Sequence, residues 1–305
     1  MKTIVNYLLS ILFFAQSFAQ APYLLVLGTA QDGGYPQAGC NKDCCRAVWE
    51  KKLTFQGVSC LALVDPQTGQ RWLFDATPDF KEQLQALKSF TKDPSNQLAG
   101  IFLTHAHIGH YTGLMDLGRE VMGAQQVGVY AMPRMKQFLE TNGPWSQLTQ
   151  IENIKIQPLQ DSQIITLNGR LKVRPFRVPH RDEFSETVGF EIMGLHKKVI
   201  FLPDIDKWQK WTTSLKTVLE GVDFAFIDGT FYQDGEINRP MSEVPHPFVT
   251  ETMSLLKELP PNQKVKVQFI HLNHTNPLLR RDSPEAQAVR KQGFGIAETG
   301  QCIEL

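Results

Sequence analysis

Apolar and polar residues alternate along the chain in two distinct ways. Short apolar runs bounded by Gly, Pro and Asn are typical of strands, whereas longer segments with apolar residues three and four apart are typical of helices. In the first half the strand-like runs lie at residues 23–27, 58–64, 71–74, 98–103 and 127–130. Helical spacing predicts helices over residues 80–90, 111–122 and 132–140.

The second half begins with strands alone and then alternates. Strands are predicted at residues 154–159, 164–167, 171–179, 188–192 and 198–202. Helices at 207–220, 247–259 and 283–292 follow, with strands at 224–227 and 265–270 between them. Turn chemistry at 65–69 and at Asn168-Gly169 predicts two hairpins. Strands grouped between helices in each half predict an α/β (α+β) fold, with two sheets face to face and helices outside.

Composition narrows the classes of partner. The chain has 305 residues, 42% of them hydrophobic and 20% charged, which suits a packed core. Lys+Arg and Asp+Glu both number 31, so the chain lacks the basic excess of a general binder of nucleic acids or anionic membranes. We therefore expect a small-molecule substrate and no nucleic-acid partner. Oligomeric state is left open.

The N-terminus has the pattern of an export signal. Met1-Lys2 is followed by an apolar stretch over residues 4–14 and then by Ser17-Phe18-Ala19. This pattern predicts a secretory signal peptide over residues 1–19 and a mature single domain over residues 20–305. We expect an exported chain, periplasmic in a Gram-negative source, with no membrane contact after cleavage.

Three histidines follow the predicted strand at 98–103. His105 and His107 are two residues apart, so extended backbone points both side chains the same way and lets them grip one cation. His110 comes one turn later and points towards a second cation. The stretch resembles the His-x-His-x-Asp-His motif of the metallo-β-lactamase superfamily, with Gly109 in place of the Asp. The resemblance implies a four-layer αββα sandwich with its metal site along one edge.

The resemblance also assigns the remaining metal ligands. His180, after a later strand, would complete a three-histidine site with His105 and His107. Asp204, at another strand end, would bridge two cations, since a carboxylate has two oxygens. His271 would join His110 and Asp204 at the second cation.

Two further positions qualify this ligand set. Asp75 matches the first motif of the superfamily, where the carboxylate orients a ligand and does not bind metal. Gly109 has no side chain to offer, so we expect the second cation to have one protein ligand fewer than usual.

A cysteine-rich segment suggests another metal site. Cys40, Cys44 and Cys45 supply three thiols, and three thiolates with one imidazole make a closed tetrahedral zinc site. The phosphodiesterase of the carbon–phosphorus lyase pathway, which the chain resembles here, implies His274, three residues after His271, as the fourth ligand. Export favours the alternative of a Cys40–Cys44 or Cys40–Cys45 disulfide.

Motifs along nearly the whole mature chain also resemble the pyrroloquinoline-quinone biosynthesis protein B group. They include residues 33–36, the cysteines, residues 228–231 and residues 271–277. That group often lacks the first two histidines of the motif, whereas this chain has both.

The resemblances together support a hypothesis of metal-assisted hydrolysis. One or two Zn2+ ions, with Fe or Mn as alternatives, would supply hydroxide at neutral pH to attack a small or cyclic phosphodiester. His246 would donate a proton to the leaving group, and Asp228 would hydrogen-bond a ligand histidine or the substrate. Three alternatives stay open: a lactone or ester hydrolase, an iron-dependent oxidative protein and a metal-binding protein without catalysis.

Overall fold

The strands form two sheets packed face to face. The structure is a computed structural model that describes residues 20–305 except 96 and 239, and within them each sheet has seven strands. The first sheet runs in the order β14 (Cys302–Glu304), β1 (Tyr23–Gly28), β2 (Cys60–Asp65), β3 (Gln70–Phe74), β4 (Gly100–Phe102), β5 (Val127–Ala131) and β6 (Ile154–Pro158). The second runs in the order β13 (Gly295–Ile296), β12 (Val267–Ile270), β11 (Phe224–Asp228), β10 (Lys198–Leu202), β9 (Val188–Met193), β8 (Lys172–Arg177) and β7 (Ile165–Thr166).

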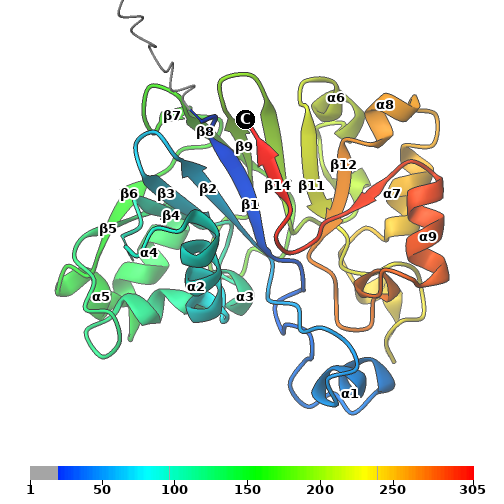
Figure 1. Cartoon of the computed structure of the whole chain (residues 1–305), viewed down its shortest axis with the longest axis horizontal. Helices are drawn as coiled ribbons and strands as arrows, with labels where there is room; N and C mark the ends of the chain where they lie inside the picture. The colour runs from blue at the N-terminus through cyan, green and yellow to red at the C-terminus, as the bar shows by residue number, and fades with distance from the viewer. Residues whose placement is uncertain (1–19, 96, 239) are drawn as a thin grey trace, which may run out of the picture.

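Helices cover the outer face of each sheet (Figure 1). The first sheet is covered by α2 (Phe80–Thr91), α3 (Ile108–Tyr111), α4 (Pro133–Thr141) and α5 (Trp145–Gln150). The second is covered by α6 (Leu215–Glu220), α7 (Val249–Leu255), α8 (Pro261–Lys264) and α9 (Pro284–Lys291). The short helix α1 (Asp43–Trp49) stands apart at the lower end of the view. The layers are those of the predicted αββα sandwich.

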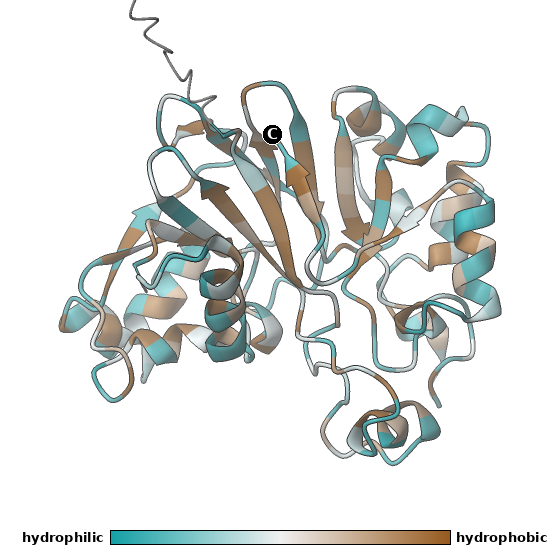
Figure 2. Cartoon of the chain, in the orientation of Figure 1, coloured by the Kyte–Doolittle hydropathy of each residue, from teal (hydrophilic) through white to brown (hydrophobic). Residues whose placement is uncertain are grey.

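Aromatic side chains fill the space between the sheets. Phe74 on β3 contacts Phe190 on β9 of the opposite sheet, with ring centroids 5.3 Å apart. Phe102 on β4 reaches the same Phe190 ring at 5.5 Å. All three are fully buried, and full burial of a phenylalanine contributes roughly 1.5–3 kcal/mol. Figure 2 shows brown, hydrophobic strands in both sheets, as this inner layer requires.

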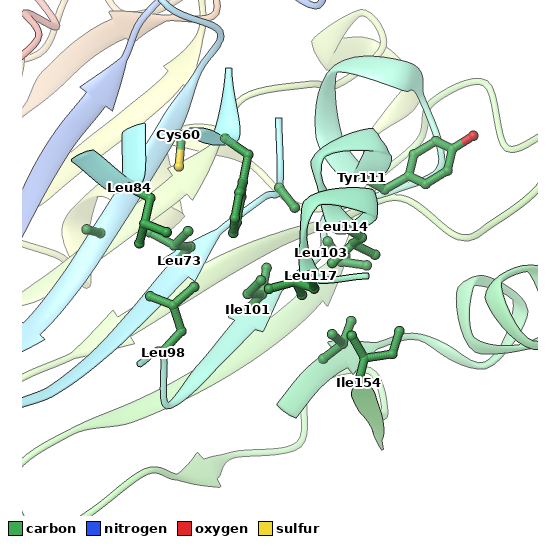
Figure 3. Close-up of a cluster of buried hydrophobic side chains, with 14 of the residues drawn as sticks. Cys60, Leu73, Leu84, Leu98, Ile101, Leu103, Tyr111, Leu114, Leu117 and Ile154 are labelled. Carbon is green, nitrogen blue, oxygen red and sulfur yellow. The ribbon is translucent and has the colours of Figure 1, made fainter. Parts of the chain in front are cut away.

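A second apolar layer joins the first sheet to its helices. Phe80, Leu84 and Leu87 lie at helical spacing on α2 and point into this apolar layer. They meet side chains such as Leu73 and Ile101 from β3 and β4 (Figure 3). The sheet therefore buries apolar residues on both faces, which explains why its strands read as continuous apolar runs.

Both predicted hairpins are confirmed. The turn at 65–69 joins the antiparallel strands β2 and β3, and Asn168-Gly169 lies between the antiparallel strands β7 and β8. The helix predicted over 111–122 is wrong in extent, because α3 ends at Tyr111, a 3₁₀ turn follows at Thr112–Leu117, and residues 118–122 form a bend and a turn. Gly113 explains the change, since its N–H binds the carbonyl of Ala76 and a Cβ there would lie 2.2 Å from the carbonyl oxygen of Thr77.

The helix predicted over 207–220 begins later than expected. Residues 208–210 form a 3₁₀ turn, and α6 starts only at Leu215, after Ser214 at its N-terminal boundary. Two further 3₁₀ turns lie at Met241–Glu243 and Pro277–Leu279. Within the described residues, no helix has the length and apolar character to cross a membrane. The signal peptide predicted for residues 1–19 lies outside the described residues.

Candidate metal centre

The histidine-rich loop is fixed by the neighbouring strand. Because β3 and β4 are parallel, their carboxyl ends meet, and Asp75 follows one while Thr104 follows the other. Asp75 accepts hydrogen bonds from the Thr104 N–H (2.8 Å) and the Thr104 hydroxyl (2.9 Å). Asp75 has a φ of +70°, a conformation that Asp tolerates better than most residues. This contact sets the start of the loop that carries His105, His107 and His110.

The second sheet brings its site residues together by the same rule. Strands β10, β11 and β12 are parallel neighbours, and Asp204, Asp228 and His271 come at or just after their carboxyl ends. Ligand sites of α/β sheets lie at such ends. The two sheets thus direct seven of the predicted residues to one edge of the sandwich, as expected.

The first predicted ligand set is assembled. The donor atoms of His105, His107, His180 and Asp204 all lie within 4.8 Å of one another. His105 Nε2 is 2.8 Å from His107 Nδ1 and 3.3 Å from Asp204 Oδ2, and His180 Nε2 is 3.6 Å from Asp204 Oδ1.

The second set contains a residue that the sequence did not suggest. His110, Asp204 and His271 come together as predicted, and Asp32 joins them. The loop after β1 brings this carboxylate to the place beside Gly109, where the sequence led us to expect one ligand fewer. Asp204 lies in both sets, as a bridging carboxylate must. The sequence offered one signal for Asp32, namely an acidic residue in a glycine-rich loop after a strand.

Each histidine uses one ring nitrogen for a polar neighbour and turns the other to the site. His110 Nδ1 is 2.7 Å from Asp75 Oδ2, and His271 Nδ1 is 3.0 Å from the hydroxyl of Thr230. His180 Nδ1 is 3.3 Å from Asp206, which Lys210 also holds. Partners of this kind fix the ring orientation of metal-ligating histidines. Asp75 therefore has the predicted position, and Asp206 and Thr230 are orienting residues that sequence reasoning missed.

The remaining two histidines follow the same arrangement. His105 Nδ1 lies 3.0 Å from the Thr104 hydroxyl. His107 faces His105 through Nδ1 and contacts the exposed Glu183 through Nε2, at 3.2 Å. Neither Thr104 nor Glu183 was predicted as a site residue.

The unpaired atoms fit divalent cations. Among the described residues, five buried atoms of the two sets have no hydrogen-bond partner: Asp32 Oδ1, His110 Nε2, His180 Nε2, Asp204 Oδ1 and His271 Nε2. Buried polar atoms are nearly always satisfied, so such a cluster needs an explanation. Donor atoms about 2.0–2.2 Å from a tetrahedral ion lie roughly 3.4 Å from one another. The donor separations here, 2.8–3.6 Å, match that spacing.

Electrostatics keep the bridging carboxylate ionised. Burial opposes ionisation of Asp204, but His271, His180 and His246 around it hold its pKa well below the ordinary value. Burial likewise opposes protonation of His105 and lowers the pKa of its ring well below normal. A neutral imidazole and an ionised carboxylate are the forms that bind metal.

His246 and Asp228 form a pair beside Asp204. His246 Nδ1 lies 2.8 Å from Asp228 Oδ2 and 3.1 Å from Asp204 Oδ1. Burial lowers the pKa of His246, but Asp228 and Asp204 outweigh it and raise the pKa to about 10. Asp228 is held in turn by the N–H groups of Ile205 and Thr230. Since Nδ1 faces the carboxylates, Nε2 is the ring nitrogen left to contact a molecule bound beside His246.

A cleft opens beside His246. Its volume is about 300 Å³, and its lining includes Gln31, Gln37, Arg181, Phe231, His246 and Asn273. Polar amides, one guanidinium and one aromatic ring thus line the cleft beside His246. A larger cavity of about 730 Å³ lies between β8, β10 and α6 and contains none of the ligand residues.

Three cysteines are brought together at the start of α1, where Cys40 precedes the helix and Cys44 and Cys45 lie in its first turn. The sulfurs of Cys40, Cys44 and Cys45 lie within 4.8 Å of one another, and all five cysteines of the chain are free thiols. His274 is outside this group, with Nδ1 3.2 Å from Asn273 Oδ1, and it lines the cleft. Its role as fourth ligand stays a prediction. Cys60 is fully buried in the core, as expected for a small apolar residue.

This geometry agrees with a family comparison. A model described as "Beta-lactamase superfamily domain" matches residues 70–271. The chain belongs to the metallo-β-lactamase superfamily. The matched range contains every predicted histidine and carboxylate of the two ligand sets, whereas Asp32 and the clustered Cys40, Cys44 and Cys45 lie before it.

Individual relatives extend the likeness over most of the chain. Coenzyme PQQ synthesis protein B of Methylococcus capsulatus is 28% identical over 92% of this chain and 99% of its own length. The counterpart in Xanthomonas oryzae pv. oryzae is 26% identical with the same coverage.

Two solved structures share the fold. Zn2+-bound PqqB from Methylobacterium extorquens has a TM-score of 0.78 at 24% identity, covering 93% of this chain and all of that one. A diphosphatase of the PhnP family has a TM-score of 0.64 at 21% identity, covering 94% of this chain and 98% of that one.

Proposed function

We propose that this member of the superfamily is a metal-dependent hydrolase of small phosphodiesters. The observation that carries the proposal is the pair of four-residue donor sets that share Asp204. Two-metal sites of this kind clamp the attacking and leaving oxygens of an in-line displacement. When bound, the divalent cations would activate water at neutral pH and neutralise charge on the reacting group.

The chain's own residues account for the other requirements of hydrolysis. His246, with Nδ1 held by Asp228, would present Nε2 to the cleft and give a proton to the leaving oxygen. Arg181 would pair with a phosphate oxygen, since guanidinium binds such oxygens in a bidentate manner. The cleft volume of about 300 Å³ favours a small substrate.

The experiment combines metal analysis with turnover. The mature chain, from Gln20 onward, is purified without added metal, and its metals are quantified beside those of His105→Ala. Both proteins are then assayed with bis(p-nitrophenyl) phosphate, a 2′,3′-cyclic nucleotide, a lactone and a carboxylic ester. We expect phosphodiester turnover that depends on the metals and that His105→Ala abolishes. Turnover of the lactone or ester alone would move the assignment to that class, and equal metal content in both proteins would contradict the proposal.

A second candidate has support from the full-length relatives. They are named for synthesis of coenzyme PQQ, so an oxidative role at the same edge of the sandwich is the competing assignment. The set of His110, His271, Asp32 and Asp204 also contains the two imidazoles and a carboxylate that suit Fe(II). Metal identity separates the two: zinc or manganese in the histidine sites supports hydrolysis, and iron with oxygen consumption supports the oxidative role.

A further inference from the structure

Asp32 and Gly109 occupy one place in the site, although 77 positions separate them in the sequence. A Cβ built on Gly109 would lie 2.2 Å from Asp32 Oδ1 and 2.6 Å from Asp32 Cα. Gly109 lies in α3, and its backbone is not in the left-handed region that favours glycine. The space taken by Asp32 is therefore the constraint that requires glycine at position 109.

The loop that carries Asp32 is anchored beside one of the ligands. The N–H of Gln31 donates to the carbonyl of Leu272 (2.8 Å), and the N–H of Leu272 donates to the carbonyl of Thr29 (2.8 Å). Leu272 directly follows His271. These two backbone bonds tie the loop to the end of β12 and set the distance between Asp32 and the His271 ring.

The Asp32 carboxylate faces the site with one oxygen. Oδ1 lies 3.0 Å from His110 Nε2 and 3.4 Å from His271 Nε2, and Oδ2 accepts from the side-chain amide of Gln31 at 3.1 Å. Oδ1 is buried and, among the described residues, has no partner in hydrogen-bond geometry. An acid that only braced the loop would direct both oxygens at donors. Here the orphaned oxygen and the two orphaned ring nitrogens are close to one another, as ligands of a common ion are.

We propose that Asp32 is a protein ligand of the second cation, supplied by the first loop in place of the side chain that Gly109 lacks. The second set then has four protein donors, namely Asp32, His110, Asp204 and His271. This inference rests on cation binding at the proposed hydrolytic site but not on its substrate. It makes the N-terminal loop, outside the family-matched range, a part of the metal centre.

Metal binding tests the inference without any assay of turnover. Wild type, Asp32→Ala and Asp32→Asn are stripped and titrated with Zn2+ against a chromophoric chelator, and Mn2+-loaded samples are examined by electron paramagnetic resonance. Glu50→Gln is the control, since it removes a charge from an exposed acid of the same segment. We expect two histidine-site ions and a spin-coupled manganese pair in wild type and Glu50→Gln. Both Asp32 variants should bind the second ion at least about 100-fold more weakly, since even partners of ligands contribute about 10–100-fold.

A swap of the two residues sharpens the test. Gly109→Asp alone should disrupt the centre, because its side chain meets Asp32. In Asp32→Gly with Gly109→Asp, the colliding carboxylate is gone, although the loop must still shift because the Cα of residue 32 lies 2.6 Å from the new Cβ. The double variant should bind the second ion at least about tenfold more tightly than Asp32→Gly does, an interaction that a double-mutant cycle isolates. A gain of this size would show that the two positions supply the same ligand.

The outcomes distinguish this inference from the proposed function. If the Asp32 variants keep the second ion at wild-type affinity, or if wild type binds only one ion at saturating metal, Asp32 is not a ligand. If wild type binds two ions and the Asp32 variants one, the assignment holds even if no phosphodiester is cleaved. Circular dichroism of each variant confirms that the fold is intact.

Discussion

His246 Nδ1 lies 2.8 Å from Asp228 Oδ2, so the ring is held with its other nitrogen free for the cleft. His246 belongs to neither of the two four-residue donor sets, and it is 3.1 Å from the bridging Asp204. His246, Asp204 and Asp228 form a further cluster of potential ligand atoms. Its expected contribution is to the leaving group.

We expect His246→Gln to slow the cleavage of poor leaving groups selectively. General acid catalysis contributes about 10²–10⁴-fold, and a leaving p-nitrophenolate needs little of it. The kcat for an alkyl phosphodiester should therefore fall by roughly that factor, while the kcat for bis(p-nitrophenyl) phosphate changes much less. Metal content, measured alongside, should equal that of wild type. Equal losses on both substrates would contradict the assignment.

The cysteine cluster gives a prediction that is independent of the substrate. Three clustered thiols suit zinc, and a structural zinc contributes directly to folding. Cys44→Ser should lose one zinc per chain and lower the melting temperature, while the histidine-bound metals stay. Cys302→Ser, the same substitution at an exposed cysteine on β14, should change neither.

The rival disulfide predicts a different result for the same proteins. A Cys40–Cys44 or Cys40–Cys45 bond would make the mature chain about 2 Da lighter by intact mass and remove two free thiols. Zinc content would then be the same in Cys44→Ser as in wild type. That pattern would exclude the structural zinc.

Sequence reasoning correctly predicted the positions of candidate ligands that come shortly after a strand. His105, Asp204 and His271 each come after an apolar run, and parallel neighbours necessarily end at one edge of their sheet. The strands of the two sheets were predictable from their apolar runs. The hairpins were predictable from turn sequences of five residues (65–69) and of two residues (Asn168-Gly169).

Asp32 was not predictable by that route. Its position depends on backbone bonds between the first loop and Leu272, which are about 240 positions apart and which no local pattern records. The role of Asp206 was missed because its contact with His180 depends on how two loops pack. Helix α1 was missed because its cysteine-rich sequence has little apolar periodicity.

The aromatic contact between the sheets predicts a large effect on stability. Phe190 lies within 5.3 Å of Phe74 and 5.5 Å of Phe102 by ring centroids, and it is fully buried. Phe190→Ala should lower the free energy of unfolding by about 3–5 kcal/mol, since it leaves a cavity between the sheets. Phe55→Ala, at an exposed phenylalanine, should stay within about 0.5 kcal/mol of wild type. Urea denaturation of the metal-loaded proteins measures both.

The carboxylates behind the histidines predict effects on separate ions. Asp75 holds His110, and Asp206 holds His180, each through Nδ1 of the ring. An amide in place of either carboxylate keeps the shape but removes the charge that raises the basicity of the ring. Asp75→Asn should therefore lower the affinity for the second ion about 10–100-fold, and Asp206→Asn should lower the affinity for the first ion by a similar factor.

Chelator competition on the two variants shows whether the sites respond separately. In Asp75→Asn the first ion should lose less affinity than the second, because Asp75 contacts the His110 ring directly and reaches His105 only through Thr104. In Asp206→Asn the second ion should keep its affinity. If both variants weaken the same ion, the division into two donor sets that share Asp204 is wrong. If each variant lowers the affinity for a different ion, the two sites are distinct. Asp204→Ala should then lower the affinity for both ions, because Asp204 belongs to both donor sets.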